Sequence, residues 1–82
     1  MNDLIQRAAA ICGLDNPNSD QLAAWLGEQI GGLSIEIRSG ESQCSTIARC
    51  YWFSTKPHPT LLECLAAAVV EVDRIEREAK QP

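Results

Sequence analysis

The stretch CYWFSTKPHPTLLECLAAAVV, residues 50–70, joins two kinds of pattern and decides the fold. Its first part is rich in aromatic residues, as strands are, whereas its last part is apolar almost all round, as buried helices are. Pro57 and Pro59 cannot lie in a central strand because neither has an N–H to donate. We therefore expect the strand to end there, and Thr60, three residues before Glu63, to begin a helix with a capping box.

The helix that follows Thr60 is expected to form the centre of the core. Its apolar positions recur at helical spacing. They are Leu61, Leu62, Leu65, Ala66, Val69, Val72 and Ile75. Over residues 73–80 acids and bases alternate at i, i+3 and i+4 spacing, which favours a solvated helical face.

Two more helices are expected before this one. Apolar residues recur at helical spacing over residues 2–14, and Gly13 supplies a stop signal. Asn18 and Gln21 resemble a capping box for a second helix, which should end at the glycine pair 31–32.

Between the helices the pattern changes to that of strands. Residues 33–38 alternate apolar and polar side chains, residues 39–43 resemble a hairpin loop, and residues 44–54 suit a second, antiparallel strand. The predicted fold class is α+β, of order ααββα, with an antiparallel β-hairpin packed against three helices. Because 82 residues leave room for one core, we expect a single domain over residues 1–82.

Composition and charge exclude several classes of function. The longest apolar run, Leu65 to Val70, is too short to span a bilayer, and no pattern typical of a secretion signal is present near the N-terminus. The net charge of −4 would repel nucleic acid. We therefore expect a cytoplasmic protein that binds neither a membrane nor nucleic acid directly.

The chain has four residues that could serve metal binding or nucleophilic catalysis. They are Cys44, Cys50, His58 and Cys64. A zinc site is disfavoured because no C-x-x-C pair is present, and a Cys–His nucleophile is disfavoured because no third group is evident to orient the histidine. We expect core thiols and an exposed loop histidine, and therefore a protein that is no enzyme and has no catalytic residue, cofactor or metal.

Three consecutive aromatic residues, Tyr51, Trp52 and Phe53, point to alternate sides of the predicted strand. Helices on one face of a two-stranded sheet cannot bury all three, so at least one should remain for a partner. The alternative is that all three belong to the core or rim of the monomer. The first interpretation makes Tyr51 and Trp52 candidate partner-binding residues.

Acidic side chains are the other candidates for partner binding. Asp20 and Glu28 fall in the second predicted helix, and Glu36 and Glu41 fall in or near the first strand. With Asp3 and Asp15, these carboxylates could complement Lys and Arg side chains of a partner. The expected partner is a protein with a basic surface.

The stretch STKPHPTLLECLAAAVVEV, after an aromatic strand, resembles the end of small phage-encoded α-β-α sandwich proteins. The stretch QLAAWLGEQIGGLSIEI is similar to the helix and first strand that precede it there, so the resemblance covers roughly residues 20–72. It implies a small accessory protein that binds a host protein. Anti-CRISPR proteins are similar in size, in acidic charge and in having no catalytic motif, and they commonly occlude a basic nucleic-acid-binding surface.

The predicted function is therefore that of a phage-type inhibitor or accessory factor, similar to anti-CRISPR proteins, that occludes a basic surface of a host protein in the host cytoplasm. The alternative is a homo-oligomeric structural or adaptor module, for example a homodimer, whose subunits associate through sheet edges.

Overall fold

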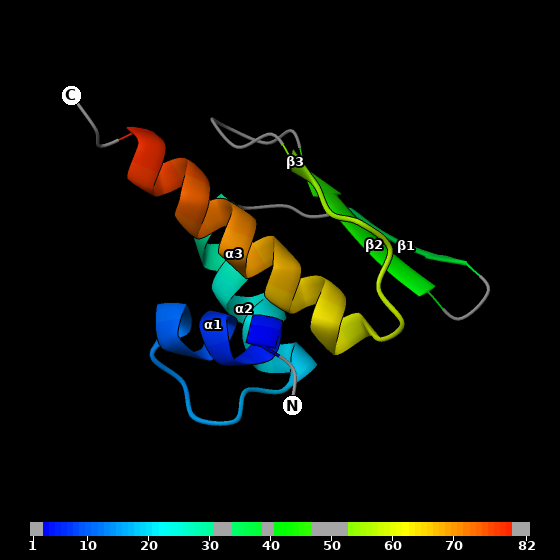
Figure 1. The fold of residues 1–82 in the computed structure, drawn as a ribbon, viewed down its shortest axis with the longest axis horizontal. Coiled ribbons are helices and arrows are strands. Elements are labelled where there is room, and N and C mark those ends of the chain that lie inside the picture. Colours follow the sequence, from blue (N-terminus) through cyan, green and yellow to red (C-terminus); the bar gives the residue numbers. More distant parts are fainter. Residues whose placement is uncertain (1–2, 31–33, 39–40, 47–52, 80–82) are drawn as a thin grey trace.

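The structure, a computed structural model, describes the backbone of residues 3–30, 34–38, 41–46 and 53–79, and the side chains of residues 3–29 and 55–79. Its elements in chain order are α1 (Asp3–Cys12), α2 (Ser19–Ile30), β1 (Ser34–Arg38), β2 (Glu41–Thr46), β3 (Phe53–Ser54) and α3 (Leu61–Ala79) (Figure 1). The longest element, α3, contacts α1, α2 and β2. It therefore holds the other elements together.

The helix α1 ends at Cys12, directly before the predicted stop signal Gly13. Gly13 adopts a φ of +70°, in the left-handed region that glycine occupies without steric cost. The backbone N–H of Leu14 donates to the carbonyl of Ala9 at 3.0 Å, which closes the helix as in a Schellman motif.

Of the two predicted capping boxes, the one at α2 is complete, and the one at α3 is present through its hydroxyl bond. Asn18 Oδ1 accepts from the backbone N–H of Gln21 at 2.8 Å, and Gln21 Oε1 accepts from the backbone N–H of Asn18 at 3.0 Å. This reciprocal pair is a capping box, and it begins α2. At α3 the Thr60 hydroxyl accepts from the backbone N–H of Glu63 at 3.2 Å, so the helix begins where the sequence predicted.

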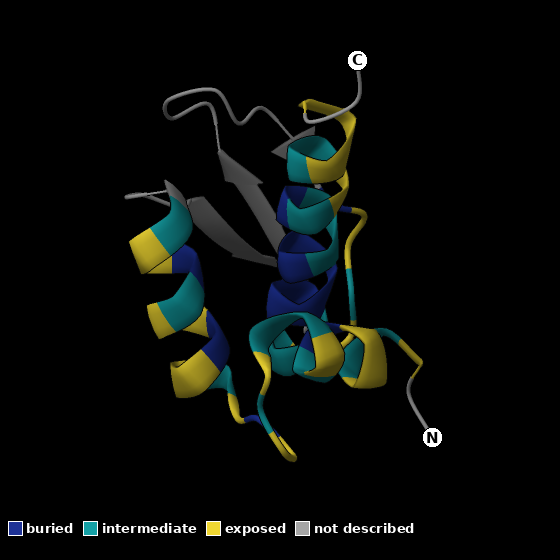
Figure 2. Cartoon of the chain, turned by 90° about the vertical axis from the view of Figure 1, so that its left-hand side faces the viewer, coloured by how far each residue is buried: buried dark blue, intermediate teal, exposed yellow. Residues whose placement is uncertain are grey.

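The hydrophobic core lies where the three helices meet. Its buried members are Ala8, Leu22, Leu26, Cys64, Leu65, Ala66, Ala68, Val69 and Val72. Six consecutive residues of α3, 64–69, are buried, which confirms that the early part of this helix is apolar almost all round and forms the centre of the core. In Figure 2 the buried residues run through the middle turns of α3 and along the inner side of α2.

The predicted fold class is wrong. We predicted an α+β fold of order ααββα, with the helices packed on a two-stranded hairpin. Where the structure describes side chains, residues 3–29 and 55–79, it is instead a three-helix, all-α globule in which every residue of the hydrophobic core comes from a helix. The physical reason is that the apolar faces of the helices meet one another, and α1 and α2 pack on α3.

The backbone ladder also differs from the prediction. It has three antiparallel strands in the order β1-β2-β3. Pairing of β1 with β2 starts at Arg38 and Glu41, so most of the predicted loop 39–43 belongs to a strand. The predicted second strand, residues 44–54, is divided between β2 and β3, because Thr46 pairs with Phe53.

No helix within the part of the chain that the structure describes is long and apolar enough to cross a membrane.

Candidate functional site

Four of the six predicted partner-binding residues have side chains that the structure does not describe. Tyr51 and Trp52 lie outside the described residues altogether. Glu36 and Glu41 lie in β1 and β2, where the register pairs them with Gln43 and Arg38 respectively, so they do not face each other across the ladder. Their role in binding stays a prediction.

The other two predicted residues, Asp20 and Glu28, lie exposed on α2. Asp20 occupies the first turn of this helix, where the positive end of the helix dipole favours a carboxylate. The two residues are eight positions apart, about 12 Å along the helix axis. They are exposed at opposite ends of the same helix.

Asp20 and Glu28 belong to a larger set of exposed carboxylates, which we call the acidic surface. Its members are Asp3, Asp15, Asp20 and Glu28. No ion pair joins any of them to a cation within the described residues, and Arg7 is the only Lys or Arg in residues 3–29. The acidic surface therefore keeps its charge available to a partner.

The carboxylates of α3 behave differently because they are paired within the helix. Arg74 contacts Glu71 at 2.8 Å and Glu78 at 3.1 Å, and Arg77 contacts Asp73 at 2.8 Å. Hydrogen bonding and charge attraction from Glu71, and then from Glu78, raise the pKa of Arg74. These pairs confirm the solvated, charge-alternating face predicted for the last turns.

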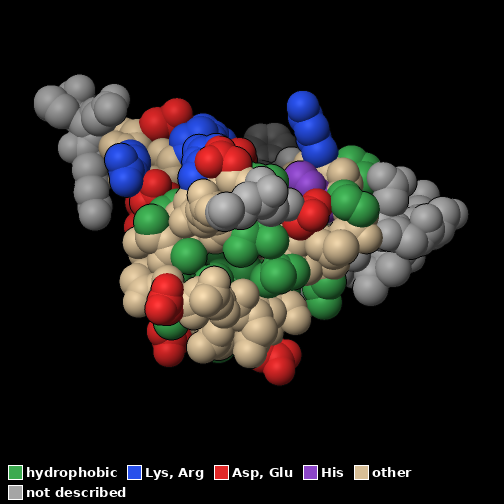
Figure 3. Space-filling view, turned by 60° about the horizontal axis from the view of Figure 1, so that its bottom comes forward, with side chains coloured by type: hydrophobic (Ala, Val, Ile, Leu, Met, Phe, Trp, Pro, Cys, Tyr) green, Lys and Arg blue, Asp and Glu red, His purple; other side chains and the backbone are tan. Residues whose placement is uncertain are grey.

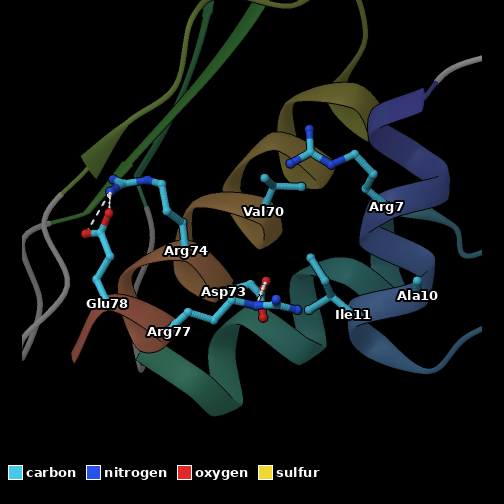
Figure 4. Close-up of a pocket in the computed structure, with 8 residues that line it drawn as sticks. All are labelled: Arg7, Ala10, Ile11, Val70, Asp73, Arg74, Arg77 and Glu78. Carbon is cyan, nitrogen blue, oxygen red and sulfur yellow. Dashed lines mark hydrogen bonds and ion pairs between the residues drawn. The ribbon is translucent and has the colours of Figure 1, made fainter. Parts of the chain in front are cut away.

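A groove runs between α1 and α3, and we call it the α1/α3 groove. It consists of two adjoining hollows of about 500 and 400 Å³ that share Arg7, Val70 and Arg74. The first hollow is lined in addition by Ala10, Ile11, Asp73, Arg77 and Glu78 (Figure 4). The second is lined in addition by Leu4, Thr55, Lys56, His58, Ala67 and Glu71.

The groove has an apolar floor and a cationic rim. In Figure 4 the Arg7 side chain extends from α1 toward α3, and Arg77 extends from α3 toward Ile11. Arg74 and Glu78 also line the first hollow, and their ion pair lies toward the strands (Figure 4). Arg7 and Lys56 are exposed and form no ion pair within the described residues.

The distribution of charge is visible on the face that carries the groove. In Figure 3 the Lys and Arg side chains and the histidine lie along the upper edge of the view with acidic side chains among them, and further acidic side chains lie along the lower edge. Four of the seven Lys and Arg residues of the chain line the groove. Three carboxylates, Glu71, Asp73 and Glu78, also line the groove and pair with Arg74 and Arg77, so its cations without an ion pair within the described residues are Arg7 and Lys56.

The described cysteines lie in or against the core. Cys64 is fully buried, as expected of a small apolar residue, and its Sγ forms a hydrogen bond of 3.9 Å with Thr55 Oγ1. Cys12 is a half-buried free cysteine, and burial raises the pKa of its thiol. Cys44 and Cys50 lie outside the residues whose side chains are described.

His58 lies in a different environment from the one predicted. It is half-buried and lines the second hollow of the groove beside Lys56, whereas the sequence suggested an exposed loop histidine. Among the residues the structure describes, no three His, Cys, Asp or Glu side chains are grouped closely enough to hold a metal ion.

Sequence reasoning missed the α1/α3 groove. One signal was present: Arg7 lies three residues after Leu4 and four before Ile11, so it falls within the apolar stripe of α1. A cationic side chain within an apolar stripe lies beside the face of the helix that packs on another element. Nothing in the pattern of α1, however, indicates which other helix supplies the second wall.

Comparison with models of protein families, with curated proteins and with solved structures finds no match to this chain.

Proposed function

We propose that this chain is a non-catalytic binding protein that covers a basic surface of a partner protein with its acidic surface. The observation that carries the proposal is the contrast between two sets of carboxylates. Those of α3 that lie beside arginine are paired within the helix, whereas Asp3, Asp15, Asp20 and Glu28 are exposed and unpaired within the described residues. Unpaired surface charge can complement groups of opposite charge on a partner protein.

The electrostatics favour a basic partner. Residues 3–29 carry four carboxylates and a single arginine, so α1 and α2 form the most acidic part of the described chain. A potential of one sign over such a surface speeds the approach of a partner of opposite charge and opposes wrong partners. Binding should therefore weaken as salt rises, since exposed charges are screened over roughly 8–10 Å at 0.1–0.15 M ionic strength.

The resemblance to phage-encoded proteins supports a more specific version of this proposal. In that version the partner is a host protein, and the covered surface is one that would otherwise bind nucleic acid. The chain would then act as an inhibitor or an accessory factor of the anti-CRISPR kind. The alternative prediction, a homo-oligomer associated through sheet edges, would use β1 and β3, which are the outer strands of the ladder.

The test is a capture experiment with two matched variants. The first, Asp15→Asn/Asp20→Asn/Glu28→Gln, neutralises three residues of the acidic surface. The control, Glu71→Gln/Asp73→Asn/Glu78→Gln, removes the same amount of charge from carboxylates that are already paired in α3. Partners captured from a host extract are identified by mass spectrometry, and their affinities are then measured against salt concentration.

We expect the first variant to bind the captured partner at least about tenfold more weakly, a loss of about 1.4 kcal/mol, and to lose much of the salt dependence. The control should bind as the wild type does. Equal binding by the wild type and the first variant, with both folded by circular dichroism, would contradict the proposal.

A further inference from the structure

The α1/α3 groove and the acidic surface belong to one chain and have opposite charge. We propose that the groove binds a second copy of this chain, whose acidic tip enters it. The acidic tip is the connection from Gly13 to Asn18 with the first turn of α2, and it carries Asp15 and Asp20. This inference goes beyond the proposed function and needs no partner protein.

The groove has the chemistry to receive an acidic, partly apolar projection. Its floor includes Ala10, Ile11 and Val70, which offer apolar contact. Its rim includes Arg7 and Lys56, the two groove cations that form no ion pair within the described residues. Arg74 and Arg77 are already paired with carboxylates of α3, so Arg7 and Lys56 supply the attraction for an incoming anion.

The acidic tip has the complementary charge and projects from the molecule. It projects from the helices as the blue-to-cyan connection between α1 and α2 (Figure 1). Asp15 and Asp20 are exposed on it, and Leu14, beside Asp15, is half-buried and can add apolar contact.

The tip is also fixed in conformation. The hydrogen bond from the backbone N–H of Leu14 to the carbonyl of Ala9 fixes the first part of the tip. The capping box of Asn18 and Gln21 fixes its last part. Pro17, between them, is buried. A preorganised tip loses little conformational entropy on binding.

A twofold dimer follows from the positions of the two surfaces. Ile11 of the groove and Asp15 of the tip are four residues apart, so groove and tip are neighbours on the molecule. Two neighbouring surfaces of complementary charge can meet reciprocally about a twofold axis, each tip in the groove of the other copy. Such a dimer would cover Asp15 and Asp20, so that self-association and binding of a basic partner exclude each other.

The test is sedimentation velocity of the full chain between about 10 μM and 1 mM, at low and high salt. We expect a monomer–dimer equilibrium that shifts toward monomer as salt rises. Arg7→Gln/Lys56→Gln and Asp15→Asn/Asp20→Asn should each weaken dimerisation at least about tenfold. The charge-conserving variant Arg7→Lys/Lys56→Arg and the distant variant Glu28→Gln should dimerise as the wild type does.

A charge swap makes the test specific to the proposed pairing. Arg7→Glu/Lys56→Glu/Asp15→Lys/Asp20→Lys should restore a dimer that each half of the swap abolishes. A wild-type monomer at about 1 mM, or a dimer unchanged in folded groove and tip variants, would overturn the proposal. Because Arg7 and Lys56 lie outside the acidic surface, loss of dimerisation in Arg7→Gln/Lys56→Gln with partner binding intact separates this inference from the proposed function.

Discussion

Two glycines of this chain have opposite conformational requirements. Gly13 has a φ of +70° at the end of α1, whereas Gly27 lies inside α2, and a Cβ at either position would meet no atom within 4 Å. Both sites therefore have room for a Cβ, and the effect of an alanine substitution depends only on the backbone conformation. We expect Gly13→Ala to lower the free energy of unfolding by about 1 kcal/mol, because an L-residue is strained in the left-handed region.

Gly27→Ala is the matched control, and it should act in the opposite direction. Alanine favours the helix over glycine by roughly 0.5–1 kcal/mol, so this substitution should raise the free energy of unfolding. Urea denaturation followed by circular dichroism measures both variants. Equal effects of the two substitutions would contradict the assignment of Gly13 as the left-handed cap.

The thiol of Cys12 should make stability depend on pH in the alkaline range. Its pKa is raised by burial above the ordinary 9.0, so the folded state holds the proton more tightly than the unfolded state. The resulting stabilisation is present below pH 9 and is lost as pH rises through the folded pKa. Above pH 9 the free energy of unfolding of the wild type should therefore fall relative to that of Cys12→Ala, as measured by urea denaturation.

Residue chemistry made the helix boundaries predictable but not the groove. Gly13, Asn18 and Thr60 act through bonds to their own neighbours in sequence, so a short pattern contains the whole interaction. Arg7 and Lys56 line the same hollow only because α1 and the segment after β3 both lie against α3. A short sequence pattern contains no information on such packing between distant segments.

At the scale of elements, the cap of α3 makes a testable contribution. The Thr60 hydroxyl accepts from the backbone N–H of Glu63 at 3.2 Å. We expect Thr60→Ala to lower the free energy of unfolding by about 1 kcal/mol, because a helix N–H loses its acceptor. Thr60→Ser, which keeps the hydroxyl, should stay within about 0.5 kcal/mol of the wild type in the same urea denaturation. A similar loss in both variants would show that the hydroxyl is not the cause.

The strands were harder to predict than the helices. Residues 44–54 form a run of β-branched and aromatic residues without glycine, proline, asparagine or aspartate, so propensity predicts one strand. The register instead pairs Thr46 with Phe53, which places two strands within that run. The hydrogen bonds of a strand depend on a partner strand elsewhere in the sequence, whereas those of a helix are local. The sequence pattern therefore predicted the helices correctly but merged two strands into one.

At the scale of the whole molecule, periodicity identified the apolar face of each helix but not which faces meet. The sequence correctly placed Leu65, Ala66, Val69 and Val72 at the centre of the core. It wrongly assigned a β-hairpin, and not α1 and α2, as the main surface on which this helix packs. α3 is buried all round at residues 64–69, which include three alanines, and both α1 and α2 contact this helix.

Because α3 lies at the centre of the core, we expect a substitution in its buried part to destabilise all three helices together. Leu65 is 1% exposed and belongs to the cluster that joins all three helices. We expect Leu65→Ala to lower the free energy of unfolding by about 2–5 kcal/mol, through lost burial and a residual cavity. An 82-residue chain has a total stability of about 4–12 kcal/mol, so the loss is a large part of the whole.

Because α1 and α2 both pack on α3, this substitution should weaken every helix together. Urea denaturation of Leu65→Ala, followed by circular dichroism and by tryptophan fluorescence, should give coincident transitions at a lower midpoint. The volume-conserving variant Leu65→Met should lose less than about 1.5 kcal/mol. Separate transitions for the two probes in the alanine variant would show that the helices do not share one core, and they would contradict the central role of α3.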